Sequence, residues 1–169
     1  MKDEIFEVLN PENQRVGEAP RQIVHASGLY HRSVHVFIFN STGEVLVQQR
    51  APSKDICPGA WDVSVAEHAK PGECGYQTAL RGVREELGVE VTVSLLADFR
   101  LNQFEYPERG VKDFEFVQTY QAVHDGPFTL DPVEVAGARF ITMQELLKSA
   151  HEAPGGFTPW LHRDLSLFS

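Results

Sequence analysis

Carboxylates and histidines are the side chains of this sequence whose types and spacing point to metal chemistry. Glu85 and Glu86 are adjacent in ECGYQTALRGVREELGVE, residues 73–90. On a helix at 100° per residue, Glu86 lies at the edge of the apolar arc and Glu85 on the far side. A carboxylate beside a buried arc needs a partner. A divalent cation would be one, and Arg81, Arg84 or a residue elsewhere would be another.

A second set of ligand-type residues is spread along the chain. Asp113 and Glu115 alternate on a predicted strand, so both side chains point to one face. His25, His31 and His68 precede or begin other predicted elements. Three histidines and two carboxylates suit a transition metal, Mg²⁺ or Mn²⁺. The sequence holds seven histidines, and many different sets of three can be chosen from them. The spacing alone therefore supports this site weakly.

The segment that carries Glu85 and Glu86 is the best predicted helix, over residues 73–87. Its apolar arc comprises Tyr76, Ala79, Leu80, Val83 and Leu87, and Gly88 stands where a left-handed C-cap is favoured. An ordinary amphipathic helix explains Glu85 well and Glu86 poorly. Gly82 costs roughly 0.5–1 kcal/mol relative to alanine. Close approach of another segment or an ordinary packing reason would explain it.

Several strands must position these side chains. The sequence predicts two short strands within residues 4–19, a hairpin over residues 31–50 and a short strand over 61–68. It further predicts strands over 89–106, 113–124 and 133–141, a helix after an N-cap at Thr142, and a short helix over 158–165. Strands mixed with two substantial helices predict an α/β fold with a sheet covered on both faces.

Composition limits the class of protein. A chain of 169 residues fits a single domain over residues 1–169. The formal net charge of −9 argues against nucleic acid or an anionic membrane as the main partner. The two cysteines, Cys57 and Cys74, are interpreted as small buried apolar residues in a reducing cytoplasm. We find no signal peptide and no apolar run of membrane-spanning length, and the sequence leaves the oligomeric state open.

The helical segment resembles the Nudix box, G-x5-E-x7-R-E-U-x-E-E-x-G-U, where U is a bulky aliphatic residue. The matching residues are Glu73, Arg81, Val83, Glu85, Glu86, Gly88 and Val89. Two positions depart, since Glu67 replaces the opening glycine and Gly82 replaces the glutamate after Arg81. The resemblance implies a Nudix α/β/α sandwich with a mixed β-sheet. It also implies that the box binds Mg²⁺ for cleavage of a nucleoside diphosphate derivative, with Glu73 supporting Glu85 and Glu86.

Most of the chain, about residues 5–165, resembles the isopentenyl-diphosphate isomerase branch of that superfamily. The shared features are Arg50 and Lys54 at R-x3-K spacing, PGAW at residues 58–61 and FTPW at 157–160. The resemblance implies metal binding by His31, His68, Asp113 and Glu115, and by His25 if one residue is deleted before His31. The isomerase's catalytic cysteine lies two residues before the histidine that His68 matches, and Ala66 stands there.

We therefore expect a Mg²⁺- or Mn²⁺-dependent hydrolase of a diphosphate in a small molecule, with Arg50 and Lys54 contacting phosphates. Glu115 or Glu134 would act as general base. Ordinary surface charge for Arg50 and Lys54, and a solvated turn carboxylate for Glu134, remain alternatives. Two further functions stay open: an isomerase with an acid other than cysteine, and a non-catalytic diphosphate-binding domain. Trp61 and Trp160 are interpreted as core residues.

Overall fold

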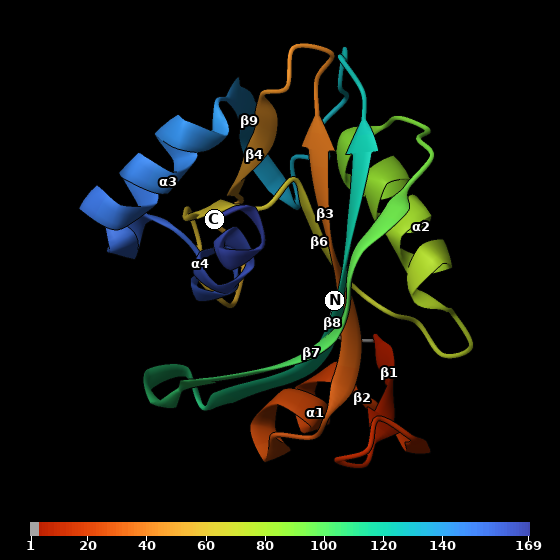
Figure 1. Cartoon of the computed structure of the whole chain (residues 1–169). Helices are drawn as coiled ribbons and strands as arrows, with labels where there is room; N and C mark the ends of the chain where they lie inside the picture. The colour runs from red at the N-terminus through yellow and green to blue at the C-terminus, as the bar shows by residue number, and fades with distance from the viewer. Residues whose placement is uncertain (1–3) are drawn as a thin grey trace.

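A seven-stranded mixed sheet forms the centre of the molecule, which a computed structural model describes over residues 4–169 (Figure 1). Its central strands are β3 (His31–Phe39) and β8 (Val111–Val123), which pair in parallel from His31↔Glu115 to Phe39↔Val123. The others are β4 (Val45–Arg50), β5 (Trp61–Asp62), β6 (Val65–His68), β7 (Ser94–Tyr106) and β9 (Val135–Ile141). All remaining pairs in this sheet are antiparallel.

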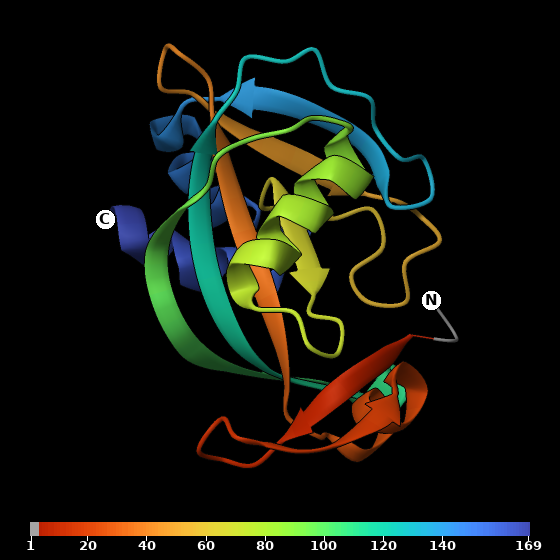
Figure 2. The same cartoon turned by 90° about the vertical axis from the view of Figure 1, so that its right-hand side faces the viewer.

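Helices cover both faces of the sheet, so the expected α/β/α sandwich with a mixed sheet is confirmed (Figures 1 and 2). On one face lies α2 (Gly75–Leu87), and on the other lie α3 (Met143–Glu152) and α4 (Pro159–Asp164). Short 3₁₀ turns occupy Pro107–Arg109, Pro154–Gly156 and Leu165–Phe168. Helix α3 begins at the expected N-cap, where the Thr142 hydroxyl accepts from the Glu145 amide.

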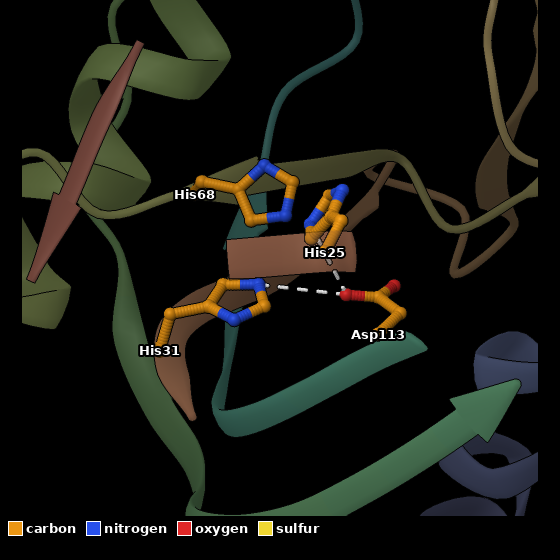
Figure 3. Close-up of side chains that lie close together, drawn as sticks. All are labelled: His25, His31, His68 and Asp113. Atoms are coloured by element: carbon orange, nitrogen blue, oxygen red, sulfur yellow. Dashed lines mark ion pairs between the residues drawn. The ribbon is translucent and has the colours of Figure 1, made fainter. Parts of the chain in front are cut away.

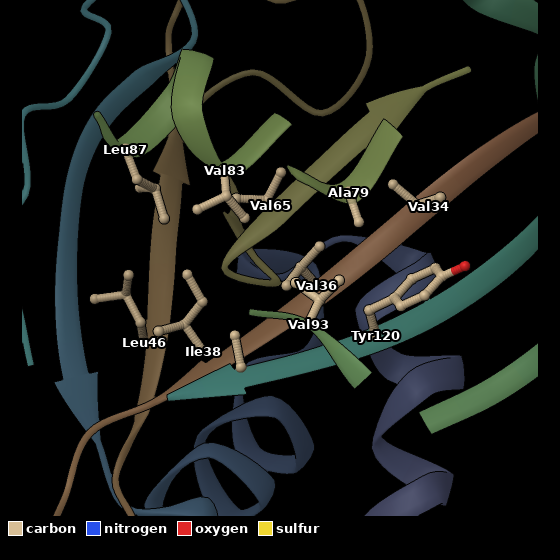
Figure 4. Close-up of a cluster of buried hydrophobic side chains, with 11 residues drawn as sticks. Val34, Val36, Ile38, Leu46, Val65, Ala79, Val83, Leu87, Val93 and Tyr120 are labelled. Carbon is tan, nitrogen blue, oxygen red and sulfur yellow. The ribbon is translucent and has the colours of Figure 1, made fainter. Parts of the chain in front are cut away.

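Apolar residues of α2 anchor it to the sheet (Figure 4). Ala79, Val83 and Leu87 are fully buried against β-branched residues such as Val36 and Val65. Full burial of a valine or leucine side chain contributes about 1.5–3 kcal/mol. Helix α2 ends at Gly88, whose φ of +66° is the left-handed conformation that glycine adopts without strain. These contacts fix which face of α2 its carboxylates present.

An N-terminal unit lies at one end of the sheet, made of the hairpin β1 (Ile5–Leu9) and β2 (Arg15–Pro20) and the helix α1 (Arg21–Ser27) (Figure 2). A bridge joins it to the chain before β3, where the Leu9 amide donates to the Tyr30 carbonyl at 2.9 Å. Gly28 ends α1 with φ of +65° and sits against Lys112 and Phe114 of β8. The unit therefore packs closely on the end of β8.

Three details differ from the sequence-based expectations. Helix α1 was not among the predicted elements, and β7 begins at Ser94 rather than at residue 89. The interpretation of Tyr76 as a core residue is wrong, because its exposed fraction is 45%. At this first turn Gly75 faces the sheet instead, since a Cβ on Gly75 would overlap the Gln118 side chain. The apolar arc of α2 therefore reaches the core only from Ala79 onward.

Candidate functional site

One cavity of about 150 Å³ collects most of the candidate residues. It lies between the end of α2, the strands β3, β6 and β8, and the loop after β4. Its lining includes the carboxylates of Glu4, Glu67, Glu85, Glu86, Asp113, Glu115, Asp131 and Glu134. The strongly basic side chains of the lining are Arg21, Arg50 and Lys54. Carboxylates thus outnumber permanent cations on the wall, which favours binding of added cations.

Four of the predicted ligands converge beside this cavity, and two of them, His68 and Asp113, also line its wall (Figure 3). One ligand atom from each of His25, His31, His68 and Asp113 lies within 4.8 Å of the others. Glu115 joins them, because its Oε1 is 3.6 Å from Nε2 of His31 and 3.1 Å from Nε2 of His68. We call these five residues the histidine cluster. The structure therefore brings together all five side chains that the sequence proposed for this position.

Distant elements supply the cluster. His25 comes from α1, His31 from the first residue of β3 and His68 from the last residue of β6. Parallel pairing of β3 with β8 sets His31 opposite Glu115, and the two-residue period brings Asp113 to the same face. Nε2 of His25 and His31 and Oδ1 of Asp113 are buried without a well-formed hydrogen bond among the described residues. Oδ1 of Asp113 lies 3.6 Å from Nε2 of His25 and 3.4 Å from Nε2 of His31, so the three atoms face a common point.

One imidazole of the cluster, that of His31, holds a proton that offsets part of the negative charge of the two carboxylates. Burial opposes the charge on His31, but Asp113 and Glu115 outweigh it and raise the pKa of His31 to about 9. Burial lowers the pKa of His25 and of His68 to about 4 each, with contributions from neighbouring positive groups. Burial also opposes the charge of Glu115, yet His31 and His68 hold its pKa well below its usual value. At neutral pH the cluster thus contains one imidazolium and two neutral imidazoles.

Aromatic and basic groups enclose the cluster. The ring of Phe6 stacks on His68 at 4.6 Å and on His31 at 5.1 Å between centroids. Nη1 of Arg21 lies 3.2 Å from Nδ1 of His68, and the same guanidinium pairs with Glu4 and Asp55. This packing keeps the imidazole rings in place.

Glu86 and Glu85 differ as the helical wheel predicts. Glu86 is 4% exposed, whereas the side chain of Glu85 is 50% exposed. Nε2 of Gln48 donates to Glu86 at 2.9 Å, and no cationic side chain pairs with Glu86 among residues 4–169. Burial raises the pKa of Glu86 well above its usual value, and the charge of Glu67 adds to this. Glu86 is therefore a buried carboxyl group without a counter-charge.

Arg81 organises the remaining acidic residues of this region. Its guanidinium bonds Glu73 at 2.8 and 2.9 Å and pairs with Glu67 and Glu85 at 3.2 Å each. Glu73 also accepts from the Lys70 amide and does not line the cavity. The structure thus places Glu73 behind Arg81, where it orients this arginine rather than facing the cavity.

The two candidate phosphate-binding residues line the cavity with carboxylate partners. Arg50 is buried, donates to Asp62 at 3.1 Å and to the Ile56 carbonyl at 3.0 Å, and stacks on Trp160. Lys54 forms an ion pair with Glu134, one of the two candidate bases. Trp160 is 5% exposed and also lines the cavity. Both cations are held rigidly at the cavity wall.

Other lining residues escaped the sequence analysis. His35 is buried, with Nδ1 2.5 Å from Oδ2 of Asp164, and stands opposite Ala66 in the pairing of β3 with β6. His31, Ser33 and His35 alternate along β3, and this two-residue period of polar residues was a signal that could have found them. Glu67 was noted only as a departure from the box.

Neither cysteine lines the cavity. Cys57 is half-buried and Cys74 is exposed, so the interpretation of Cys74 as a buried apolar residue is wrong. Cys74 occupies the N-cap of α2, where the chain leaves a solvent-facing loop. Ala66 does line the cavity, and its methyl group offers no proton to a bound ligand.

The residues present fit divalent cations at two positions. In the histidine cluster, imidazole nitrogens and carboxylate oxygens lie at separations close to the roughly 4 Å between opposite ligands of one ion. Its buried atoms without well-formed hydrogen bonds are the donors that such an ion uses. At the second position, Glu86 lacks a counter-charge in the same cavity. Two cation positions, one richer in nitrogen and one in oxygen, are therefore available.

Residues 29–161 match the family described as NUDIX domain. The chain therefore belongs to the Nudix family. It is 36% identical over 143 residues to an isopentenyl-diphosphate Delta-isomerase of Cereibacter sphaeroides, covering 81% of this chain and 77% of that protein. It is 30% identical over 169 residues to Nudix hydrolase 3 of Arabidopsis thaliana, which covers 95% of this chain but only 22% of that longer protein.

The fold comparison agrees with the family. The crystal structure of DR0079 from Deinococcus radiodurans matches with a TM-score of 0.72 and 27% identity, covering 92% of each chain. The relatives named above thus include both a Nudix hydrolase and an isomerase. Within residues 4–169 we find no helix that is long and apolar enough to cross a membrane.

Proposed function

We propose that this chain is a metal-dependent hydrolase that cleaves a diphosphate bond in a small molecule, with a nucleoside diphosphate derivative as the expected substrate class. Membership of the Nudix family supports cleavage of diphosphate-containing substrates. The observation that carries the proposal is the cavity wall, where eight carboxylates face three strongly basic side chains. Such a wall would repel a diphosphate unless divalent cations lay between them. We treat residues 1–169 as one domain in this proposal.

Bound divalent cations would neutralise phosphate oxygens and lower the pKa of a coordinated water. The protein's own contribution is positioning. Glu85 and Glu86 would hold one cation in the cavity, and the histidine cluster would hold another beside it. Arg50 and Lys54 would contact the phosphate groups from the opposite wall, because Asp62 and Glu134 hold them in place.

Glu134 is the better candidate for general base. The pKa of Glu115 is held well below its usual value, because His31 and His68 overcome the effect of burial. Such a carboxylate is a weak base. Glu134 lines the cavity with a side chain 26% exposed, so it can reach an incoming water. Lys54 would orient it, and Glu115 would serve as a ligand.

The isomerase remains the second candidate, because a relative with that name is 36% identical. Moving a double bond requires an acid within reach of carbon. Ala66 stands where that branch carries a thiol, and neither Cys57 nor Cys74 lines the cavity. The cavity wall therefore favours chemistry at phosphorus over chemistry at carbon.

Incubation of the purified protein with a panel of nucleoside diphosphate derivatives tests the proposal. We expect release of phosphate, pyrophosphate or a nucleotide only when Mg²⁺ or Mn²⁺ is present, and loss of this release in Glu86→Gln. Tight binding of a diphosphate without release, in the presence of both metals, would instead support a non-catalytic binding domain. Release that persists in excess chelator would contradict the metal requirement.

A further inference from the structure

Gly82 lies in the middle of α2, where the helix crosses β6. A Cβ atom on Gly82 would lie 2.9 Å from Cβ of Glu67, 2.9 Å from Cγ1 of Val65 and 3.3 Å from Cγ of Glu67. The two separations of 2.9 Å are shorter than real Cβ atoms show. The stem of Glu67 therefore occupies the space that a side chain at position 82 would need. This explains Gly82 by close approach, one of the two explanations that the sequence left open.

Both departures from the Nudix box thus meet at one place. We propose that Glu67 supplies, from β6, the metal-binding carboxylate that α2 lacks at Gly82, and that it shares a divalent cation with Glu86. This inference rests on the proposed metal dependence and adds a ligand that the box does not include. The glutamate that is missing at position 82 of α2 would thus be replaced by a glutamate at position 67 of the adjacent strand β6.

The surroundings of Glu67 suit this role. Its side chain is 15% exposed and lines the same cavity as Glu86. One carboxylate oxygen accepts from the His68 amide at 2.9 Å, and the other lies 3.2 Å from Nη1 of Arg81. Each oxygen keeps a further lone pair, since a carboxylate offers about four acceptor positions. The carboxylate is thus fixed in direction and retains capacity for a cation.

Glu86 and Gln48 give independent support. The charge of Glu67 is the strongest charge that acts on the buried carboxyl of Glu86. Among residues 4–169, the neutral amide of Gln48 is the side chain that hydrogen-bonds the Glu86 carboxylate. Gln48 is itself 3% exposed, and its Oε1 is buried without a hydrogen-bond partner among the described residues. Two carboxylates and a buried amide oxygen are ligands that Mg²⁺ and Mn²⁺ prefer.

Titration calorimetry with Mn²⁺ alone, without substrate, tests this inference. Glu67→Gln keeps the shape of the side chain and removes its charge. We expect it to weaken Mn²⁺ binding at the site shared with Glu86 by at least about tenfold. Sites in the histidine cluster should keep their affinity, so one of two binding events is affected.

Glu7→Gln is the matched control. The side chain of Glu7 is 16% exposed, lies 3.5 Å from Arg32 and accepts from the Gly72 amide at 3.0 Å. Glu7 therefore resembles Glu67 in its exposure and in having an arginine and a backbone amide as neighbours, but it does not line the cavity. We expect unchanged Mn²⁺ affinity in this variant. An equal loss in Glu7→Gln would overturn the assignment of Glu67 as a ligand.

Moving the carboxylate back provides a second test. The triple variant Val65→Ala, Glu67→Gly and Gly82→Glu removes both obstructing side chains and restores a glutamate to α2. We expect its Mn²⁺ affinity to exceed that of the double variant Val65→Ala with Glu67→Gly by at least about tenfold. Equal affinity in the two variants, or wild-type affinity in Glu67→Gln, would overturn the inference. If wild-type protein binds no Mn²⁺ while it still releases phosphate, the metal requirement itself is wrong.

Discussion

Nε2 of His31 lies 3.4 Å from Oδ1 of Asp113, yet the two atoms do not form a well-aligned hydrogen bond. Both atoms are buried at the meeting point of β3 and β8. The proton on His31 supplies one positive charge beside the two cluster carboxylates, since its pKa is raised to about 9. A divalent cation at this point must displace that proton.

Cation binding to the histidine cluster should therefore depend on pH. Below its pKa of about 9, His31 holds a proton that competes with the cation, whereas His25 and His68, with pKa values of about 4, are already neutral at pH 7. We expect Mn²⁺ affinity to rise about tenfold per pH unit between roughly 7 and 9, with release of one proton. Calorimetry on Glu86→Gln in buffers of different ionisation enthalpy measures this. Affinity that does not change with pH would contradict it.

The two adjacent glutamates of α2 should differ in their effect on hydrolysis. Glu86 is buried in the cavity wall, and Glu85 is half-exposed and paired with Arg81 and Lys70. We expect Glu86→Gln to lower kcat/KM by about 10²-fold or more and Glu85→Gln by about tenfold or less. Steady-state rates on one diphosphate substrate at saturating Mg²⁺ provide the comparison. Equal losses, or the reverse order, would show that the wheel assignment misrepresents their roles.

Glu86→Gln should also stabilise the metal-free protein. Burial raises the pKa of Glu86 above that of the unfolded chain, so the folded state binds more protons, and the carboxyl lowers stability as pH rises above about 4.3. An amide has no charge to bury. We expect the variant to be more stable than wild type by about 1–3 kcal/mol at pH 7 in chelator. Urea unfolding at pH 7 and pH 4 measures the difference, which should shrink at pH 4.

The His35–Asp164 pair should stabilise the fold in a pH-dependent way. Burial opposes the charge of His35, but Asp164 outweighs it, and Glu115 and Asp62 also raise the pKa of His35. Arg100 shares Asp164 from the other side. The stabilisation is therefore complete below the unfolded pKa of about 6.5 and is lost as pH rises through the raised folded value.

Asp164→Asn tests that pair. We expect it to cost about 3–5 kcal/mol at pH 6, because it leaves a buried imidazolium unpaired, and less at pH 9. The free energy of unfolding in urea at both pH values is the measurement. His151→Gln, at an exposed position of α3, is the control and should change stability little at either pH. A cost for Asp164→Asn that is the same at both pH values would mean that His35 is neutral throughout.

Isopentenyl diphosphate in D₂O separates the two enzymatic functions. Ala66 supplies no proton, and both cysteines lie outside the cavity lining. We expect no deuterium in the carbon skeleton at an enzymatic rate, as followed by mass spectrometry. Incorporation by the wild-type protein, abolished in Glu115→Gln, would establish an isomerase with a different acid. Ala66→Cys is an informative companion, because it adds a thiol to the cavity wall opposite His35.

The sequence predicted the sheet and the two main helices because each has a local signal, whereas the three histidines of the cluster were singled out through the family resemblance. Alternation brought Asp113 and Glu115 to one face, and the box spacing located Glu86. Helix α1 escaped because its seven residues are too few for a clear helical period. The register that sets Ser33 opposite His68 and His35 opposite Ala66 is likewise a tertiary property.

Glu67 shows most clearly what a single sequence omits. Its position in the chain marks it only as a replaced glycine, and Gly82 only as a missing glutamate. The relation between them depends on the distance between β6 and α2, which the packing of Val65 against Val83 fixes. A relation between one residue of a strand and one residue of a facing helix leaves no periodic pattern in the sequence. It is therefore visible only in the three-dimensional structure.

His25 is the only member of the histidine cluster that stands on the N-terminal unit. A cation held by His25 and by residues of the main sheet would therefore tie α1 to the end of β8 through coordination bonds. Any transient detachment of residues 5–27 would first have to break them. A cation at 100 times its Kd opposes such detachment by about 2.7 kcal/mol. Amide hydrogens of α1 should then exchange with solvent about 100-fold more slowly on metal loading, while those of β9, remote from the cluster, keep their rates.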